Sequence, residues 1–146
     1  MIIRKTFHLE MAHKLDNYDG KCKNLHGHSY FITVELEGDT SSNGMLLDFN
    51  IIKELWKPID EQFDHSTMLG ECAENEKLIR VLREMGSNLN VVPFNPTAEH
   101  MSMYFCDILS TELRNYIKTH TITNFIRVKS VSVEETRGAE AYYVNQ

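Results

Sequence analysis

This 146-residue sequence predicts an α+β fold in which helices cover one face of an antiparallel sheet. Two observations lead to this prediction. Residues near both ends of the chain alternate between apolar and polar, as in half-buried strands, whereas the middle carries apolar residues at helical spacing. The main elements follow in the order strand–strand–helix–helix–strand–strand, so a four-stranded sheet is expected. Because this length is typical of one domain, we expect residues 1–146 to form one domain around one hydrophobic core.

The first two predicted strands cover residues 2–13 and 28–37. In both, every second residue is apolar, so one face of each strand is expected to be buried. These faces consist of Phe7, Leu9, Met11 and His13 in the first strand and of His28, Tyr30, Ile32, Val34 and Leu36 in the second. The polar segment 14–24 is expected to form the loop between them.

Three segments follow with the spacing of helices. Residues 48–63 form the first, and Pro58 is expected to end or kink it. Residues 74–86 predict a short helix, and residues 97–118 predict a long amphipathic one. Residues 91–96, VVPFNP, are expected to be irregular.

The last two predicted strands cover residues 124–136 and 139–145. Between them lies the dipeptide Arg137-Gly138, which is typical of a tight turn. Within the first of these strands, Glu135 shares a face with Val131 and Val133, whereas the neighbouring Glu134 faces the other way.

The composition excludes several classes of protein. The net charge of −6 and the absence of a basic run argue against nucleic-acid binding, although a few lysines could still hold a phosphorylated substrate. No apolar run approaches the length of a membrane span, so no membrane association is expected. The three cysteines, Cys22, Cys72 and Cys106, are widely spaced and odd in number, and the N-terminus lacks the apolar core of a secretory signal. We therefore expect reduced thiols and a cytoplasmic protein.

Three histidines at neighbouring strand ends indicate a metal site. His26 and His28 point the same way, and His13 ends the apolar face of the first strand. If the two strands are neighbours, the three imidazoles converge, a set that suits zinc and leaves one position open for water or substrate. The alternative is that they are core histidines and that His-x-His is a chance match.

The loop before His26 contains Cys22 between two lysines, Lys21 and Lys23. Neighbouring ammonium groups favour the thiolate, so this cysteine could act on a substrate beside the metal without binding the metal itself. The alternative is an unreactive loop thiol. Cys72 and Cys106 lack such neighbours and are interpreted as structural.

A series of motifs resembles those of the 6-pyruvoyltetrahydropterin synthase and 6-carboxytetrahydropterin synthase family. The motifs occur in the family's order along nearly the entire chain: His13, Cys-x-x-x-His-Gly-His at 22–28, Asp48-Phe49, Phe63-Asp64-His65, 96-PTAEH-100 and Glu135-Thr136. The three-residue gap after Cys22 is most similar to the 6-carboxy-5,6,7,8-tetrahydropterin synthases of the queuosine pathway. Residues 70–90 and His100 depart from the family's pattern and could alter the rim of the pocket.

The resemblance implies the tunnelling fold, which is a four-stranded antiparallel sheet with helices packed on one face. It also implies self-association into a ring of three subunits, with two rings usually stacked into a homohexamer. The implied cofactor is Zn²⁺, held by His13, His26 and His28.

The resemblance also implies the catalytic groups. Cys22 corresponds to the family's proton-abstracting cysteine and His65 to its relay histidine, with Asp64 beside it; Asp64 could equally cap a turn. Glu135 corresponds to the glutamate that anchors the pterin. Glu99 and Thr97 fall in a substrate-binding motif, although they could instead stabilise a helix N-terminus.

The activity implied is a zinc-dependent carbon–carbon lyase reaction. Its substrate is 7,8-dihydroneopterin triphosphate, and its products are 6-carboxy-5,6,7,8-tetrahydropterin, acetaldehyde and triphosphate. Two alternatives stay open: a 6-pyruvoyltetrahydropterin synthase, which eliminates triphosphate, and a zinc- or pterin-binding module without catalysis. The sequence leaves open which basic residues hold the triphosphate and whether a neighbouring subunit completes the site.

Overall fold

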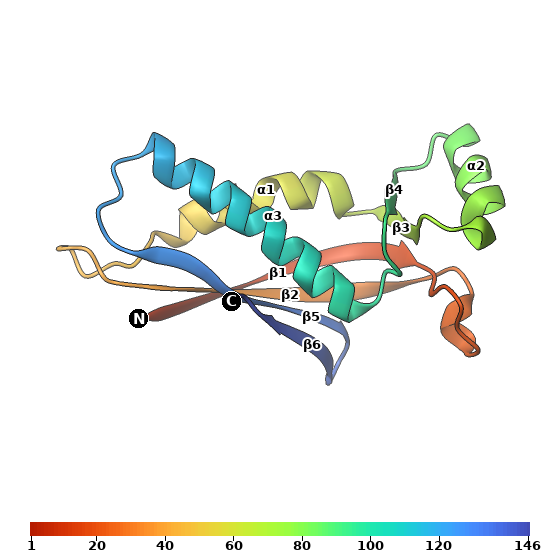
Figure 1. Ribbon diagram of the computed structural model, residues 1–146, viewed down its shortest axis with the longest axis horizontal. Helices are drawn as coiled ribbons and strands as arrows, with labels where there is room; N and C mark the ends of the chain where they lie inside the picture. Colours follow the sequence, from red (N-terminus) through yellow and green to blue (C-terminus); the bar gives the residue numbers. More distant parts are fainter.

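The computed structural model describes all residues, 1–146, and its central element is a six-stranded sheet in the order β4-β3-β1-β2-β5-β6. Figure 1 shows this sheet as a twisted layer beneath the helices. The strands are β1 Ile2–His13, β2 His26–Gly38, β3 Ser66–Gly70, β4 Leu89–Val92, β5 Ile126–Thr136 and β6 Ala139–Val144.

The expectation of four strands, all antiparallel, is wrong. The four predicted strands are present as β1, β2, β5 and β6, and they pair antiparallel. Two short strands, β3 and β4, extend the sheet and pair parallel, β3 with β1 and β4 with β3. Both are too short to show a clear alternation, and β3 is largely buried, so their residues carry no period-2 signal.

Three α-helices complete the chain, and two of them have side-chain N-caps. In α1, Phe49–Phe63, the side chain of Asp48 accepts a hydrogen bond from the Asn50 N–H. Pro58 lies inside α1 and does not end it, because Ile59 and Phe63 beyond it are buried in the core. The other helices are α2 Glu76–Glu84 and α3 Ala98–Thr119, of which α3 is capped by Thr97.

The hydrophobic core lies between the sheet and the two longer helices. Figure 1 shows α1 and α3 crossing the same face of the sheet, while α2 lies apart at the end that carries β3 and β4. Buried side chains of α1, such as Trp56, and of α3, such as Phe105, pack with the inward face of β1 and β2. No helix is both long enough and apolar enough to cross a membrane.

Candidate metal centre and adjoining cavities

Three imidazoles converge where β1 ends and β2 begins. The antiparallel register places His13 directly opposite His26, and His28 follows on the same side of β2. The ring centroids of His13 and His26 are 4.7 Å apart, those of His26 and His28 4.8 Å, and those of His13 and His28 5.2 Å. The structure therefore brings together the three histidines that strand alternation places on one face.

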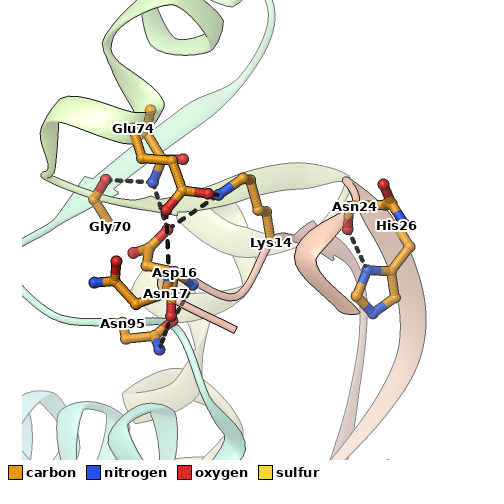
Figure 2. A network of polar contacts seen from close by, with 9 residues as sticks. Lys14, Asp16, Asn17, Asn24, His26, Gly70, Glu74 and Asn95 are labelled. Carbon is orange, nitrogen blue, oxygen red and sulfur yellow. Dashed lines mark hydrogen bonds and ion pairs between the residues drawn. The ribbon is translucent and has the colours of Figure 1, made fainter. Parts of the chain in front are cut away.

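Two of these rings are oriented by backbone carbonyl groups. The Nδ1 atom of His13 lies 2.7 Å from the Pro96 carbonyl oxygen, and that of His26 lies 2.7 Å from the Asn24 carbonyl oxygen. Figure 2 shows the second of these contacts. A ring that donates from Nδ1 presents the lone pair of Nε2, which is how a metal-binding histidine is commonly fixed. Sequence reasoning missed these partners because any residue can offer a backbone carbonyl.

The opposite ring nitrogens are buried and unpartnered. In all three histidines Nε2 is shielded from solvent and makes no hydrogen bond. An unpaired buried polar atom is costly, and three that lie together fit a bound cation much better than a hydrophobic core. The donor set, three imidazole nitrogens, suits zinc.

Two of the imidazoles are held in the form that binds metal. Burial is the largest influence on the pKa of His13 and lowers it. Burial also lowers the pKa of His28, against the opposing charge of Glu135. Both rings are therefore neutral at pH 7, which leaves their nitrogen lone pairs available.

A carboxylate from β5 reaches the same cluster. Glu135 Oε1 lies 3.1 Å from His28 Nε2, yet the two atoms are not aligned for a hydrogen bond. Ligand atoms from His13, His26, His28 and Glu135 all lie within 4.8 Å of one another. The expected facing of Glu135 toward the apolar side of its strand therefore places it beside the imidazoles.

Glu135 also borders the larger of two cavities at this end of the sheet. This cavity, of about 570 Å³, is lined by Leu15, Tyr18, Asn95, Thr97, Ala98, Glu99, Glu135, Gly138, Ala139, Glu140 and Ala141. Thr97 caps α3 by accepting a hydrogen bond from the His100 N–H, and it lines the cavity as well. The structure thus brings Thr97, Glu99 and Glu135 around one space, and Glu135 also lies beside the imidazoles.

The pair Asp64 and His65 lies at the start of β3. Asp64 Oδ2 is 2.7 Å from His65 Nδ1, and the N–H of Glu10 donates to the other oxygen, Oδ1, at 2.9 Å. Burial raises the pKa of Asp64, but these hydrogen bonds outweigh it and lower the pKa. His65 has a positive φ of 56°, held by its N–H, which donates to the Glu10 carbonyl. The side chain of Asp64 therefore links this turn to β1 and orients the His65 ring, and its role in catalysis stays a prediction.

His65 lines a second cavity, of about 360 Å³, and does not line the larger one. The lining of this second cavity includes Glu10, Ser29 and His65, and also His28 of the imidazole cluster. His28 therefore faces the His65 side, whereas Glu135, which touches His28, faces the larger cavity. In a single chain, His65 and Glu135 therefore line different cavities.

Cys22 lies in the loop between β1 and β2, in the short 3₁₀ helix Lys21–Lys23. Its carbonyl accepts a hydrogen bond from the Leu15 N–H at 2.9 Å, which ties the two sides of the loop together. The thiol is partly buried, whereas Lys21 and Lys23 are exposed. Cys72 and Cys106 are also free thiols, and burial raises the pKa of Cys106 to about 11, which suits a structural role.

A polar network that sequence reasoning missed holds the start of this loop. Figure 2 shows Asp16 at its centre, with Lys14 and Glu74 on one side and Asn95 on the other. The side chain of Asn95 accepts from the Asp16 N–H at 2.9 Å, and Asn75 donates to Asp16 Oδ1 at 2.7 Å. These residues come from three separate parts of the chain, so no local pattern could reveal the network.

Comparisons with known proteins point to one family. The sequence model of the family described as 6-pyruvoyl tetrahydropterin synthase matches residues 2–146. A 6-carboxy-5,6,7,8-tetrahydropterin synthase of Haemophilus influenzae is 38% identical over 108 residues, which is 70% of this chain and 77% of that protein. The enzyme of the same name from Rickettsia conorii is 32% identical over 136 residues, or 90% of this chain and 91% of that protein.

A solved structure shares the fold. The 6-pyruvoyl tetrahydropterin synthase of Plasmodium vivax superposes with a TM-score of 0.71, covering 100% of this chain and 99% of the other, at 20% identity. At that identity the likeness concerns the fold alone.

Proposed function

The chain belongs to the 6-pyruvoyl tetrahydropterin synthase family, and we propose that it is a zinc-dependent 6-carboxytetrahydropterin synthase. It converts 7,8-dihydroneopterin triphosphate to 6-carboxy-5,6,7,8-tetrahydropterin, acetaldehyde and triphosphate, a step toward 7-deazaguanine compounds such as queuosine. The relatives named 6-carboxy-5,6,7,8-tetrahydropterin synthase support this choice within the family.

The observation that carries the proposal is the group of three buried Nε2 atoms without partners. A binding module for a pterin has no need of such a group, and leaving three buried acceptors unpaired costs stability unless a cation binds them. His13, His26 and His28 would hold Zn²⁺ and leave a further position for the substrate's side-chain hydroxyl groups. Bound there, zinc makes a hydroxyl group more acidic and polarises a carbonyl.

The protein's own residues then handle protons. Cys22 as thiolate takes a proton from the substrate side chain, since its loop leads directly into the strand that carries two of the imidazoles. His65 relays protons, and Asp64 holds its ring through the 2.7 Å contact at Nδ1. His65 and Cys22 could serve one substrate together when a neighbouring subunit supplies one of them.

The large cavity suits the pterin ring. A carboxylate can accept two parallel hydrogen bonds, and the pterin offers such a pair through its ring N–H and adjacent amino group. Glu135 is placed for this role at the border between cavity and imidazoles. Thr97 and Glu99 line the same space and complete the proposed pterin site.

The reaction balances without a redox cofactor. One water supplies the second carboxylate oxygen on the carbon attached to the ring. The bond between the first and second side-chain carbons breaks, and the two remaining carbons leave as acetaldehyde after triphosphate departs. The ring is reduced from dihydro to tetrahydro by the electrons that the side chain loses.

We further propose that the subunits assemble into trimers with the tunnelling fold, and that two trimers form a homohexamer. Two strand edges support this proposal. β1 pairs with β3 only over Met11–His13, and β6 is an outer strand of the sheet, so the outer edges of both lack partners along much of their length. Unpaired edges invite pairing with another chain, and three sheets joined in this way close a barrel. Light scattering of the purified protein measures the subunit count, and a monomer would contradict this part.

The function is tested with purified, zinc-loaded protein and dihydroneopterin triphosphate. We expect a product with the mass of 6-carboxytetrahydropterin and an equal amount of acetaldehyde, detected by coupled reduction. A pyruvoyl product without acetaldehyde would replace this function by that of a 6-pyruvoyltetrahydropterin synthase. Tight pterin binding with no product at all would favour the binding module.

We place the reaction in the cytoplasm because all three cysteines are free thiols. Fractionation of cells with an antibody against the protein tests this location, and recovery of the protein outside the cytoplasm would contradict it.

A further inference from the structure

Glu135 is a partly buried carboxylate that lacks a partner of its own. Its side chain is 23% exposed, and no N–H or O–H group of the protein donates to it. The Nε2 atom of His28 lies 3.1 Å from Glu135 Oε1, but the two atoms are not aligned for a hydrogen bond. A carboxylate removed from water in this way needs either hydrogen-bond donors or a cation.

The backbone at Glu135 departs from the regular pairing of its strand. In the β5–β6 ladder Glu134 pairs with Glu140 and Thr136 with Ala139, so Glu135 is the extra residue of a β-bulge. The β2–β5 ladder ends one residue earlier, with Phe31 opposite Glu134. Bulges redirect side chains and are common beside active sites.

Glu135 therefore borders two different sites. Its carboxylate belongs to the group of four ligand atoms within 4.8 Å that includes the three imidazoles. The same residue lines the cavity of about 570 Å³ that suits the pterin. A carboxylate that accepts two parallel hydrogen bonds from the pterin has both oxygens engaged, which disfavours binding of a metal ion by the same oxygens.

We propose that Glu135 exchanges between these sites: it is the fourth zinc ligand while the cavity is empty and turns to the pterin when the ring enters. The inference rests on the proposed function, and it adds that pterin binding itself opens the coordination position that the substrate's hydroxyl groups then take. Without substrate, the three imidazoles and this carboxylate would supply four protein ligands, the number that closes a zinc site.

The exchange has a thermodynamic consequence. Because zinc and pterin compete for one carboxylate, each weakens the binding of the other, and linkage makes the two effects equal. A pterin without a side chain at position 6 isolates this coupling, since it reaches Glu135 but has no hydroxyl groups for the metal.

The experiment measures zinc affinity by competition with a chromophoric chelator in the full-length protein. Glu135→Gln is expected to weaken zinc binding about 10-fold or more, as is usual when a group that supports a metal is lost. Glu135→Asp should recover part of it, because the charge remains. Glu140→Gln is the matched control: it lines the same cavity but lies outside the metal group, so its zinc affinity should stay within about 2-fold of the original protein.

The second measurement is the affinity of the 6-unsubstituted pterin for the metal-free and zinc-loaded forms of the unaltered protein. The zinc-loaded form should bind it several-fold more weakly, and the visible spectrum of the cobalt-substituted protein should change when it binds. Unchanged zinc affinity in Glu135→Gln together with equal pterin affinity in both forms would overturn the exchange. If Glu135→Gln does not fold, the pterin affinities of the metal-free and zinc-loaded unaltered protein decide whether the exchange occurs.

Failure of the exchange is distinguishable from failure of the proposed function. A protein that turns over substrate while Glu135→Gln holds zinc normally keeps its function and loses only the exchange. A protein that makes no product, yet shows the coupling, keeps the exchange and loses the function.

Discussion

Two polar clusters include residues of the same strand, β2. They differ in whether their buried polar atoms have hydrogen-bond partners. At the start of the strand, the cluster around His28 contains three buried nitrogens without partners. Further along, on the opposite face, Glu35 is buried and every oxygen has a donor: Arg4 to Oε1, and Ser130 and Tyr142 to Oε2.

The difference separates function from architecture. The Glu35 cluster is complete within the chain, so its effect is on stability. The histidine cluster is incomplete within the chain, so it predicts something that the chain binds. Each prediction below tests whether this distinction holds.

The largest effect is expected for His26→Ala. Removing one of three imidazoles should reduce zinc binding below stoichiometry and turnover to background, because the remaining two hold the ion poorly. The fold should survive, since the ring is only partly buried and the core lies between sheet and helices. Metal analysis and circular dichroism check both parts. Global unfolding of the variant would show that the histidine cluster is architectural, like that of Glu35.

The next effect concerns Cys22→Ala. If the thiolate is a base and not a ligand, the variant keeps one zinc per chain and binds the pterin, but loses about 10²–10⁴-fold in turnover. Cys72→Ala is the matched control, because that thiol lies outside the histidine cluster, and its turnover should be unchanged. Loss of zinc from Cys22→Ala would place the thiol in the metal shell instead.

The sequence was informative where alternation and spacing apply. The facing of His13, His26 and His28 follows from the period of two, and so does that of Glu135 on β5. The roles of these residues stay predictions. The proximity of the three histidines was predicted only on the condition that their strands are neighbours, which the register of β1 and β2 confirms, whereas the proximity of Glu135 to them comes from the structure. The α+β class and helices α1 and α3 were predicted correctly for the same reason.

Other features could not be predicted because they depend on contacts between distant residues. Strands β3 and β4 are short and are positioned by parallel pairing, which leaves no local pattern. Glu35 lies on the polar face of its strand, and only the donors Arg4 and Tyr142 from other strands show why it is buried. The extra residue at Glu135 is likewise visible only in the register of the paired strands.

A third prediction concerns the Glu35 cluster and the pH dependence of the protein's unfolding free energy. Although burial raises the pKa of Glu35, hydrogen bonds from Tyr142, Ser130 and Arg4 lower it from 4.5 to about 2. A depressed pKa gives stability that is present above about pH 4.5 and is lost as the pH falls toward 2. The metal-free protein should therefore lose about 2 kcal/mol of its unfolding free energy between pH 7 and pH 3 through this group.

Comparison with the variant Glu35→Gln isolates the stability that Glu35 loses at low pH, because a glutamine side chain does not titrate. The variant should be less stable at pH 7 by about 1–3 kcal/mol, because an amide cannot accept all of these hydrogen bonds. Urea unfolding at both pH values gives the two differences. If original and variant proteins lose the same stability between pH 7 and pH 3, the buried carboxylate does not carry the effect.

The smallest effects come from two tyrosine hydroxyl groups, one from each cluster. Tyr142 donates to Glu35 Oε2 at 2.7 Å and is 52% exposed. Tyr142→Phe should therefore cost about 1 kcal/mol or less of unfolding free energy, because water replaces part of the lost hydrogen bond.

Tyr30 is 0% exposed, packs edge-on against His13 and His28, and its hydroxyl has no partner. Tyr30→Phe therefore removes no hydrogen bond from the metal-free protein and should leave its stability unchanged or raised. Urea unfolding of both variants at pH 7 makes the comparison, and the double variant Tyr142→Phe with Glu35→Gln should show non-additive losses. A Tyr30→Phe variant that is the less stable of the two would mean that its hydroxyl has a partner within the folded chain, and the distinction between the two clusters would fail at that residue.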